Sequence, residues 1–176
     1  MSELIHKSAS ELADLIASKS VSSVEVTEAF FDRSVELNPK TNSYLYLNRE
    51  TAVNAAKAAD AALANGEKLS PLHGVPIAVK DNLTTTDAPT TSGSKILEGW
   101  VPQYDSTVVA KLRKAGLPIL GKTNLDEFAM GSSTEYSAFG PSKNPWKSRI
   151  WDCLLRIATV SRCGRREFGW PKFGRP

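Results

Sequence analysis

Residues 75–79 constrain the fold most, because five apolar residues in succession (Val-Pro-Ile-Ala-Val) are followed directly by Lys80 and Asp81. A short apolar run bounded by turn residues is typical of a strand that is buried on both faces. If this strand is central, it carries the Lys80 ammonium into a poorly solvated site. The segment therefore predicts both a buried sheet and an unusual position for a lysine.

A second apolar run, residues 118–121, predicts another short buried strand. Between the two runs, Asp105 or Ser106 can cap a helix that contains apolar positions at helical spacing and ends at Gly116. A strand, a helix and a strand joined by brief connections form a βαβ unit. The sequence therefore predicts an α/β fold.

Three helices are expected before the first strand. Two capping boxes, Ser8–Glu11 and Ser22–Glu25, predict helix starts, and the second helix is predicted to end before Asn38-Pro39. Residues 51–64 are rich in alanine, the best helix former, and Asn65-Gly66 is expected to end that helix. The N-terminal part is thus predicted to be helical.

Charge divides the chain in two. Residues 147–176 hold eight of the 22 basic residues and two of the 19 acidic residues, so residues 1–146 are net acidic although the whole chain carries +3. Both cysteines lie in the basic segment, at a spacing that fits neither a zinc site nor a disulfide of a cytoplasmic protein. With ordinary composition and no recognisable secretory signal, the chain is expected to be cytoplasmic, with residues 1–146 as part of one domain.

Lys80 is the first candidate for chemistry, because desolvation favours the neutral amine that a general base requires. The alternative is a lysine at an exposed strand end that pairs with Asp81 and does no chemistry. A loop of small residues is the second candidate, since it brings its backbone and hydroxyl groups close to a ligand or else forms an ordinary solvated turn. Its candidate residues are Met130, Gly131, Ser132 and Ser133, and they follow a short helix predicted at residues 126–128.

Three motifs resemble the amidase signature family: residues 74–82 (GVPIAVKDN), 121–131 (GKTNLDEFAMG) and 132–146 (SSTEYSAFGPSKNPW). The resemblance covers roughly residues 3–146. It implies the first part of an α/β/α sandwich around a mixed sheet. It also implies a Ser–cis-Ser–Lys triad, in which Lys80 deprotonates a bridging serine that activates a nucleophilic serine to attack an amide.

Within that family, the motif at residues 126–135 is most similar to the glutamine-hydrolysing A subunits of tRNA-dependent amidotransferases. The resemblance implies release of ammonia from glutamine and its transfer to a partner that activates Glu-tRNA(Gln). The implied partners are subunits B and C, one of which uses ATP and magnesium. For this chain itself the resemblance implies no cofactor and no metal.

The resemblance stops after Trp146, where the family continues into a Gly/Ser-rich loop that supplies the bridging serine. Ser148 and Ser161 do not stand in such a context, so neither serine of the triad is assigned in this sequence. A shifted reading frame or disorder is the hypothesis for residues 147–176, and the chain is expected to be truncated and inactive. The alternatives are a fragment of a stand-alone amidase and an RNA-binding fragment that uses the basic tail.

Overall fold

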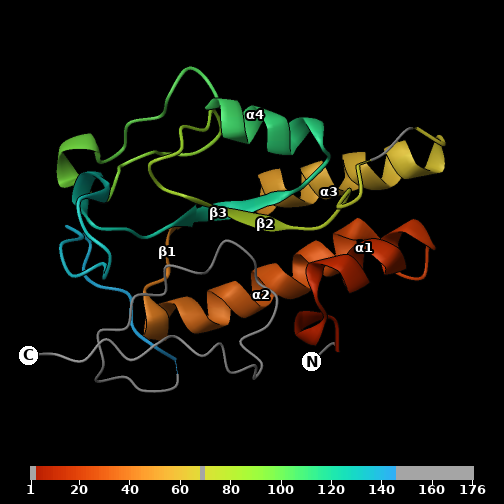
Figure 1. The fold of residues 1–176 in the computed structure, drawn as a ribbon, viewed down its shortest axis with the longest axis horizontal. Coiled ribbons are helices and arrows are strands. Elements are labelled where there is room, and N and C mark those ends of the chain that lie inside the picture. The colour runs from red at the N-terminus through yellow and green to blue at the C-terminus, as the bar shows by residue number, and fades with distance from the viewer. Residues whose placement is uncertain (1–2, 68–69, 146–176) are drawn as a thin grey trace, which may run out of the picture.

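The computed structural model describes residues 3–67 and 70–145 (Figure 1). The predicted basic tail, residues 147–176, lies outside them. In chain order the elements are η1 (Glu3–His6), α1 (Ala9–Ala17), α2 (Ser23–Thr41), β1 (Tyr44–Leu47), α3 (Arg49–Ala64), β2 (Ile77–Lys80), η2 (Lys95–Leu97), α4 (Thr107–Lys114), β3 (Ile119–Thr123) and η3 (Glu127–Ala129).

The three strands form one mixed sheet in the order β1-β3-β2. β2 runs parallel to β3 and is joined to it through α4, so the predicted βαβ unit is confirmed. β1 pairs antiparallel with β3 on the other side. The central position of β3 explains why its sequence is apolar and lacks the alternation of a half-exposed strand.

Helices cover both faces of the sheet (Figure 1). On one face, Leu120 of β3 belongs to a core formed with α1, α2 and α3, in which Phe30 is almost completely buried. On the opposite face, Ile119 and Val79 pack against Val109 of α4. Neighbouring residues of β3 thus enter different cores, as the alternation of a strand requires, and the α/β class is confirmed with helices on both sides.

The N-terminal helices begin where the capping boxes predict. Ser8 and Glu11 cap α1 reciprocally, and Ser22 and Glu25 do the same for α2. The predicted end of α2 before Asn38-Pro39 is wrong, because the helix continues to Thr41 with Pro39 in its last turns. There the proline removes one helical hydrogen bond, and the neighbouring Asn38 makes contacts outside the helix.

Those contacts join the end of α2 to β1. The Asn38 amide donates to the Tyr44 carbonyl at 3.0 Å and accepts from the Tyr44 N–H at 2.8 Å. Asn42 then ends the helix in the left-handed conformation and donates its N–H to the Asn38 carbonyl at 2.8 Å. β1, which the sequence analysis did not predict, therefore starts from a fixed point beside the helix end.

Candidate active site

The carboxyl ends of β2 and β3 meet at one edge of the sheet. Lys80, the last residue of β2, pairs with Thr123, the last residue of β3. Ligands of α/β proteins bind outside the carboxyl ends of parallel strands, so this edge is the natural place for a site. The Lys80 side chain is half-buried. It is therefore more accessible to solvent than the poorly solvated position that the sequence predicts.

The fully enclosed lysine of this edge is Lys122. Its ammonium lies 3.0 Å from a carboxylate oxygen of Asp81, and both side chains are almost inaccessible to solvent. It also donates to the Thr90 hydroxyl at 2.6 Å and to the Pro89 carbonyl at 3.2 Å. The second Asp81 oxygen accepts the Thr91 N–H at 2.9 Å and its hydroxyl at 2.5 Å. Every charge of the pair is thus compensated, as burial demands.

This pair changes the interpretation of Lys80. The alternative considered above paired Lys80 with Asp81, but the Asp81 carboxylate is turned to Lys122. Burial lowers the pKa of Lys122, and the negative charges of Asp81 and Asp87 oppose that shift. Asp81 therefore fixes the strand end that carries Lys80 without being its ion-pair partner.

The sequence analysis missed Lys122, although a signal for it existed. Lys122 continues the apolar run of residues 118–121 within one strand, so it had to be as enclosed as that run. In the parallel register it stands opposite Val79, two residues before Asp81, and side chains two apart share one face of a strand. A lysine and an aspartate on the same face of neighbouring buried strands predict an ion pair.

Asp126, which follows β3, is the second acidic residue of the edge. It is buried, and its carboxylate accepts the backbone N–H groups of Ser133 (3.0 Å), Thr134 (2.9 Å) and Tyr136 (3.0 Å). Burial by itself would raise the pKa of Asp126. The three backbone hydrogen bonds, from Tyr136, Thr134 and Ser133, and the charge of Lys80 outweigh burial and hold that pKa below its usual value.

The predicted loop curves around this carboxylate. Met130 and Ser132 are exposed, whereas Ser133 is half-buried and its hydroxyl donates to Glu135 at 2.8 Å. Gly131 passes so close to Asp126 that an added Cβ would lie 2.5 Å from the carboxyl carbon. The four loop candidates thus follow β3, whose last residue pairs with Lys80, and Asp126 holds their loop through Ser133.

The short helix predicted at residues 126–128 is the 3₁₀ turn η3, shifted by one residue so that Asp126 precedes it. Phe128 and Ala129 inside this turn have positive φ angles. Together the edge offers one half-buried amine, an ionised carboxylate and a loop of small residues with the exposed Ser132. Such a set can transfer a proton and hold a polar ligand.

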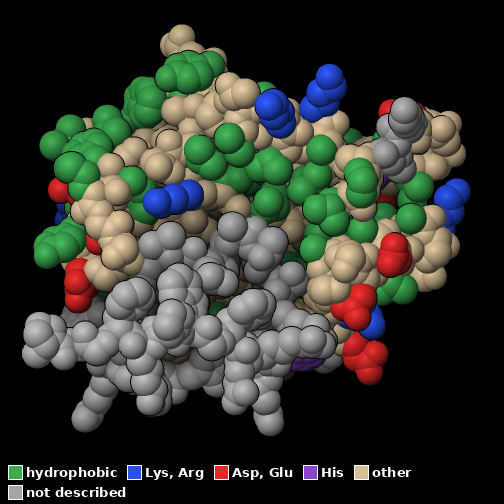
Figure 2. Space-filling view, in the orientation of Figure 1, with side chains coloured by type: hydrophobic (Ala, Val, Ile, Leu, Met, Phe, Trp, Pro, Cys, Tyr) green, Lys and Arg blue, Asp and Glu red, His purple; other side chains and the backbone are tan. Residues whose placement is uncertain are grey.

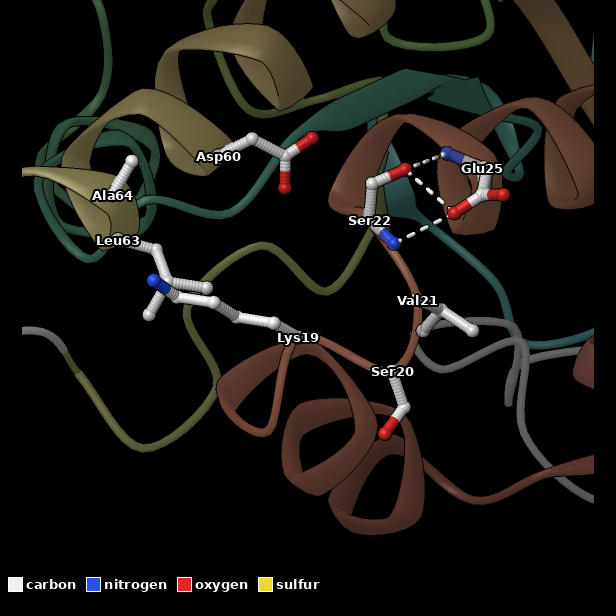
Figure 3. A pocket seen from close by; sticks show the side chains of 8 residues that line it. All are labelled: Lys19, Ser20, Val21, Ser22, Glu25, Asp60, Leu63 and Ala64. Carbon is white, nitrogen blue, oxygen red and sulfur yellow. Dashed lines mark hydrogen bonds between the residues drawn. The ribbon is translucent and has the colours of Figure 1, made fainter.

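A pocket lies elsewhere in the described part of the chain (Figure 3). It has a volume of about 320 Å³ and lies between the turn that links α1 to α2 and the end of α3. Asp60 points toward this pocket, but its carboxylate accepts the N–H groups of Ser23 and Val24 at 2.7 and 3.2 Å. Glu25 is engaged in the capping box of α2. The polar groups of the pocket thus stabilise the start of α2, and the pocket contains no predicted site residue.

Two further observations bear on the site. Among the described residues, no group of three or more His, Cys, Asp or Glu side chains is placed to hold a metal ion. No helix within that part of the chain is long and apolar enough to cross a membrane.

A family model described as amidase matches residues 25–153. The chain therefore belongs to the amidase family, as the motifs around Lys80 and Asp126 predict. It is 60% identical over 151 residues to the A subunit of the glutamyl-tRNA(Gln) amidotransferase of Acidothermus cellulolyticus, a match that covers 85% of this chain and 30% of that protein. The corresponding protein from Mycolicibacterium gilvum is 60% identical over 147 residues, with 83% and 30% covered.

Solved structures agree with this assignment. One is a chain from a vestigial protein complex connected with the evolutionary origins of an s-triazine catabolic enzyme. Its TM-score is 0.76 and its sequence identity 34%, and the match covers 81% of this chain and 31% of that one. Another is the peptide amidase of Stenotrophomonas maltophilia, with a TM-score of 0.73 and 29% identity over 81% and 30%. The chain spans about 30% of the length of the curated relatives described above.

Proposed function

We propose that this chain supplies the general base, Lys80, to a glutamine-hydrolysing amidase of the kind found as the A subunit of tRNA-dependent amidotransferases. The 60% identity to such proteins carries the proposal. The amide-hydrolysing solved structures are more distant, since the peptide amidase is 29% identical. This difference favours an amidotransferase component over a stand-alone amidase.

In the proposed reaction, the neutral amine of Lys80 accepts a proton from a bridging serine, which in turn activates a nucleophilic serine. The nucleophile attacks the side-chain amide carbon of glutamine, ammonia leaves, and water releases glutamate from the acyl-enzyme. The position of Lys80 at the carboxyl end of β2, opposite the end of β3, supports the role of base. The two serines are not assigned among the described residues.

The partners follow from the same resemblance. We propose that the ammonia serves the conversion of Glu-tRNA(Gln) to Gln-tRNA(Gln) in a complex with subunits B and C in the cytoplasm. ATP and magnesium would act in one of these partners rather than in this chain.

A chimera tests the proposal. Residues 3–145 of this chain replace the corresponding segment of the Acidothermus cellulolyticus protein, and the chimera is assayed for ammonia release from glutamine with subunits B and C present. We expect activity in the chimera and a decrease of about 10²–10⁴-fold in Lys80→Ala, the range for loss of a general base.

The matched control is Lys57→Ala, which removes an exposed lysine of α3 and should leave the rate unchanged. A folded chimera that assembles with its partners but releases no ammonia would refute the proposal. Equal rates in the chimera and its Lys80→Ala variant would refute the role of Lys80. Release of ammonia from simple amides without subunits B and C, but not from glutamine, would favour a stand-alone amidase.

A further inference from the structure

We propose that Asp126 is a positioning residue that holds the loop of residues 130–136 across the carboxyl ends of β2 and β3, beside Lys80. The inference rests on the proposed function, because that loop is the predicted substrate-contacting segment. Asp126 itself is not expected to touch substrate, since its side chain is buried.

The geometry places one carboxylate at the centre of the loop. One oxygen of Asp126 accepts the N–H groups of Ser133 and Thr134, and the other accepts that of Tyr136. All three bonds lie between 2.9 and 3.0 Å and come from residues seven to ten positions later in the chain. Hydrogen bonds to an ionised acceptor are the stronger kind, so this side chain is a main anchor of the loop.

The backbone of this region is unfavourable without such an anchor. Phe128, Ala129 and Thr134 have φ angles of 51°, 61° and 61°, a region that residues other than glycine rarely adopt. Conformations of this kind persist only where the surroundings over-determine them. At Gly131 the chain comes so close to the Asp126 carboxyl that no side chain fits. The carboxylate and the tight loop therefore depend on each other.

The same carboxylate interacts electrostatically with the proposed base. While Lys80, at the end of β2, is protonated, its positive charge is one of the influences that keep Asp126 ionised. The other charged groups near Asp126 in the chain are Glu127 in η3 and Glu135 in the loop, and Glu135 is engaged by the Ser133 hydroxyl. Asp126 thus links the amine to the loop that would present the amide.

Nuclear magnetic resonance of the ¹⁵N-labelled chain tests the proposal. On acid titration, the amide signals of Ser133, Thr134 and Tyr136 should move with one common midpoint below the ordinary aspartate value of 3.8. Lys80→Met should raise that midpoint, because it removes a nearby positive charge. Three different midpoints, or a midpoint unaffected by Lys80→Met, would overturn the proposal.

Hydrogen exchange gives the second readout. In Asp126→Asn the amides of residues 133–136 should exchange at least about tenfold faster, equivalent to loss of one hydrogen bond to a charged group. The matched control is Asp14→Asn, which removes an exposed carboxylate of α1 and should leave the loop unchanged. Unaltered loop exchange in a folded Asp126→Asn would overturn the proposal. If that variant does not fold, the titration of the chain and of Lys80→Met still decides.

None of these measurements needs amide hydrolysis. If the folded chimera releases no ammonia but the titration is as expected, the proposed function is refuted and the role of Asp126 is not. An active chimera without the common titration would do the reverse.

Discussion

At the scale of single residues, the edge of the sheet separates two lysines by their environment. Lys122 is enclosed and neutralised by Asp81, whereas Lys80 is half-buried at the end of β2. The buried ion pair holds the strand ends together, and a lysine with partial access to solvent can reach a substrate. Lys122 thus has a structural role, and Lys80 remains the candidate for chemistry.

Lys122→Met should reveal this division. It leaves the Asp81 carboxylate buried without its counter-charge, which costs about 3–5 kcal/mol. We expect the free energy of unfolding in urea to fall by that amount, and the double variant Asp81→Asn/Lys122→Met to lose less than the sum of its single variants. Lys57→Met on the exposed face of α3 is the control and should change stability by less than about 0.5 kcal/mol. Additive effects of Asp81 and Lys122 would contradict the pairing.

At the scale of elements, local signals were predictable and distant ones were not. The capping boxes at Ser8 and Ser22 lie within single helix turns, and the structure contains both. β1 escaped prediction because its hydrogen bonds go to β3, about 75 residues later in the chain. The end of α2 was misjudged for a different reason, since the helix continues through Pro39 to Thr41 and the Asn38 side chain bonds to Tyr44, six residues later. The sequence around Lys80 was enough to make it a candidate. Asp126 became a candidate only because the folded loop bonds to its carboxylate.

Asn38→Ala tests the junction between α2 and β1. It removes both bonds to the Tyr44 backbone and leaves the Tyr44 N–H without its acceptor, so we expect a loss of about 1–3 kcal/mol. Hydrogen exchange of the β1 amides should accelerate more than that of α4. Lys40→Ala, on an exposed position of the same helix turn, serves as the control. Exchange that rises equally in β1 and α4 would mean a global effect and contradict a local junction.

At the scale of the whole molecule, an apolar surface surrounds the candidate site. Figure 2 shows hydrophobic side chains on the side that carries η2 and η3 in Figure 1. Ile96 is 82% exposed, Met130 73% and Tyr136 70%. Their loops are joined by backbone bonds, for example from the Ala138 N–H to the Gly93 carbonyl at 2.9 Å. Exposed apolar clusters of this kind mark contact surfaces or aggregation sites.

We therefore expect the isolated chain to be marginally stable and to associate as its concentration rises. Ile96→Glu places a charge within this surface and should reduce association, measured by light scattering over a concentration series. Val35→Glu on α2 adds the same charge at an exposed residue outside the two loops, and it should reduce association less. A monomer with a sharp, cooperative thermal transition at every concentration would contradict the expectation. It would mean that this part of an amidase domain is a stable unit by itself, with its edge open to solvent.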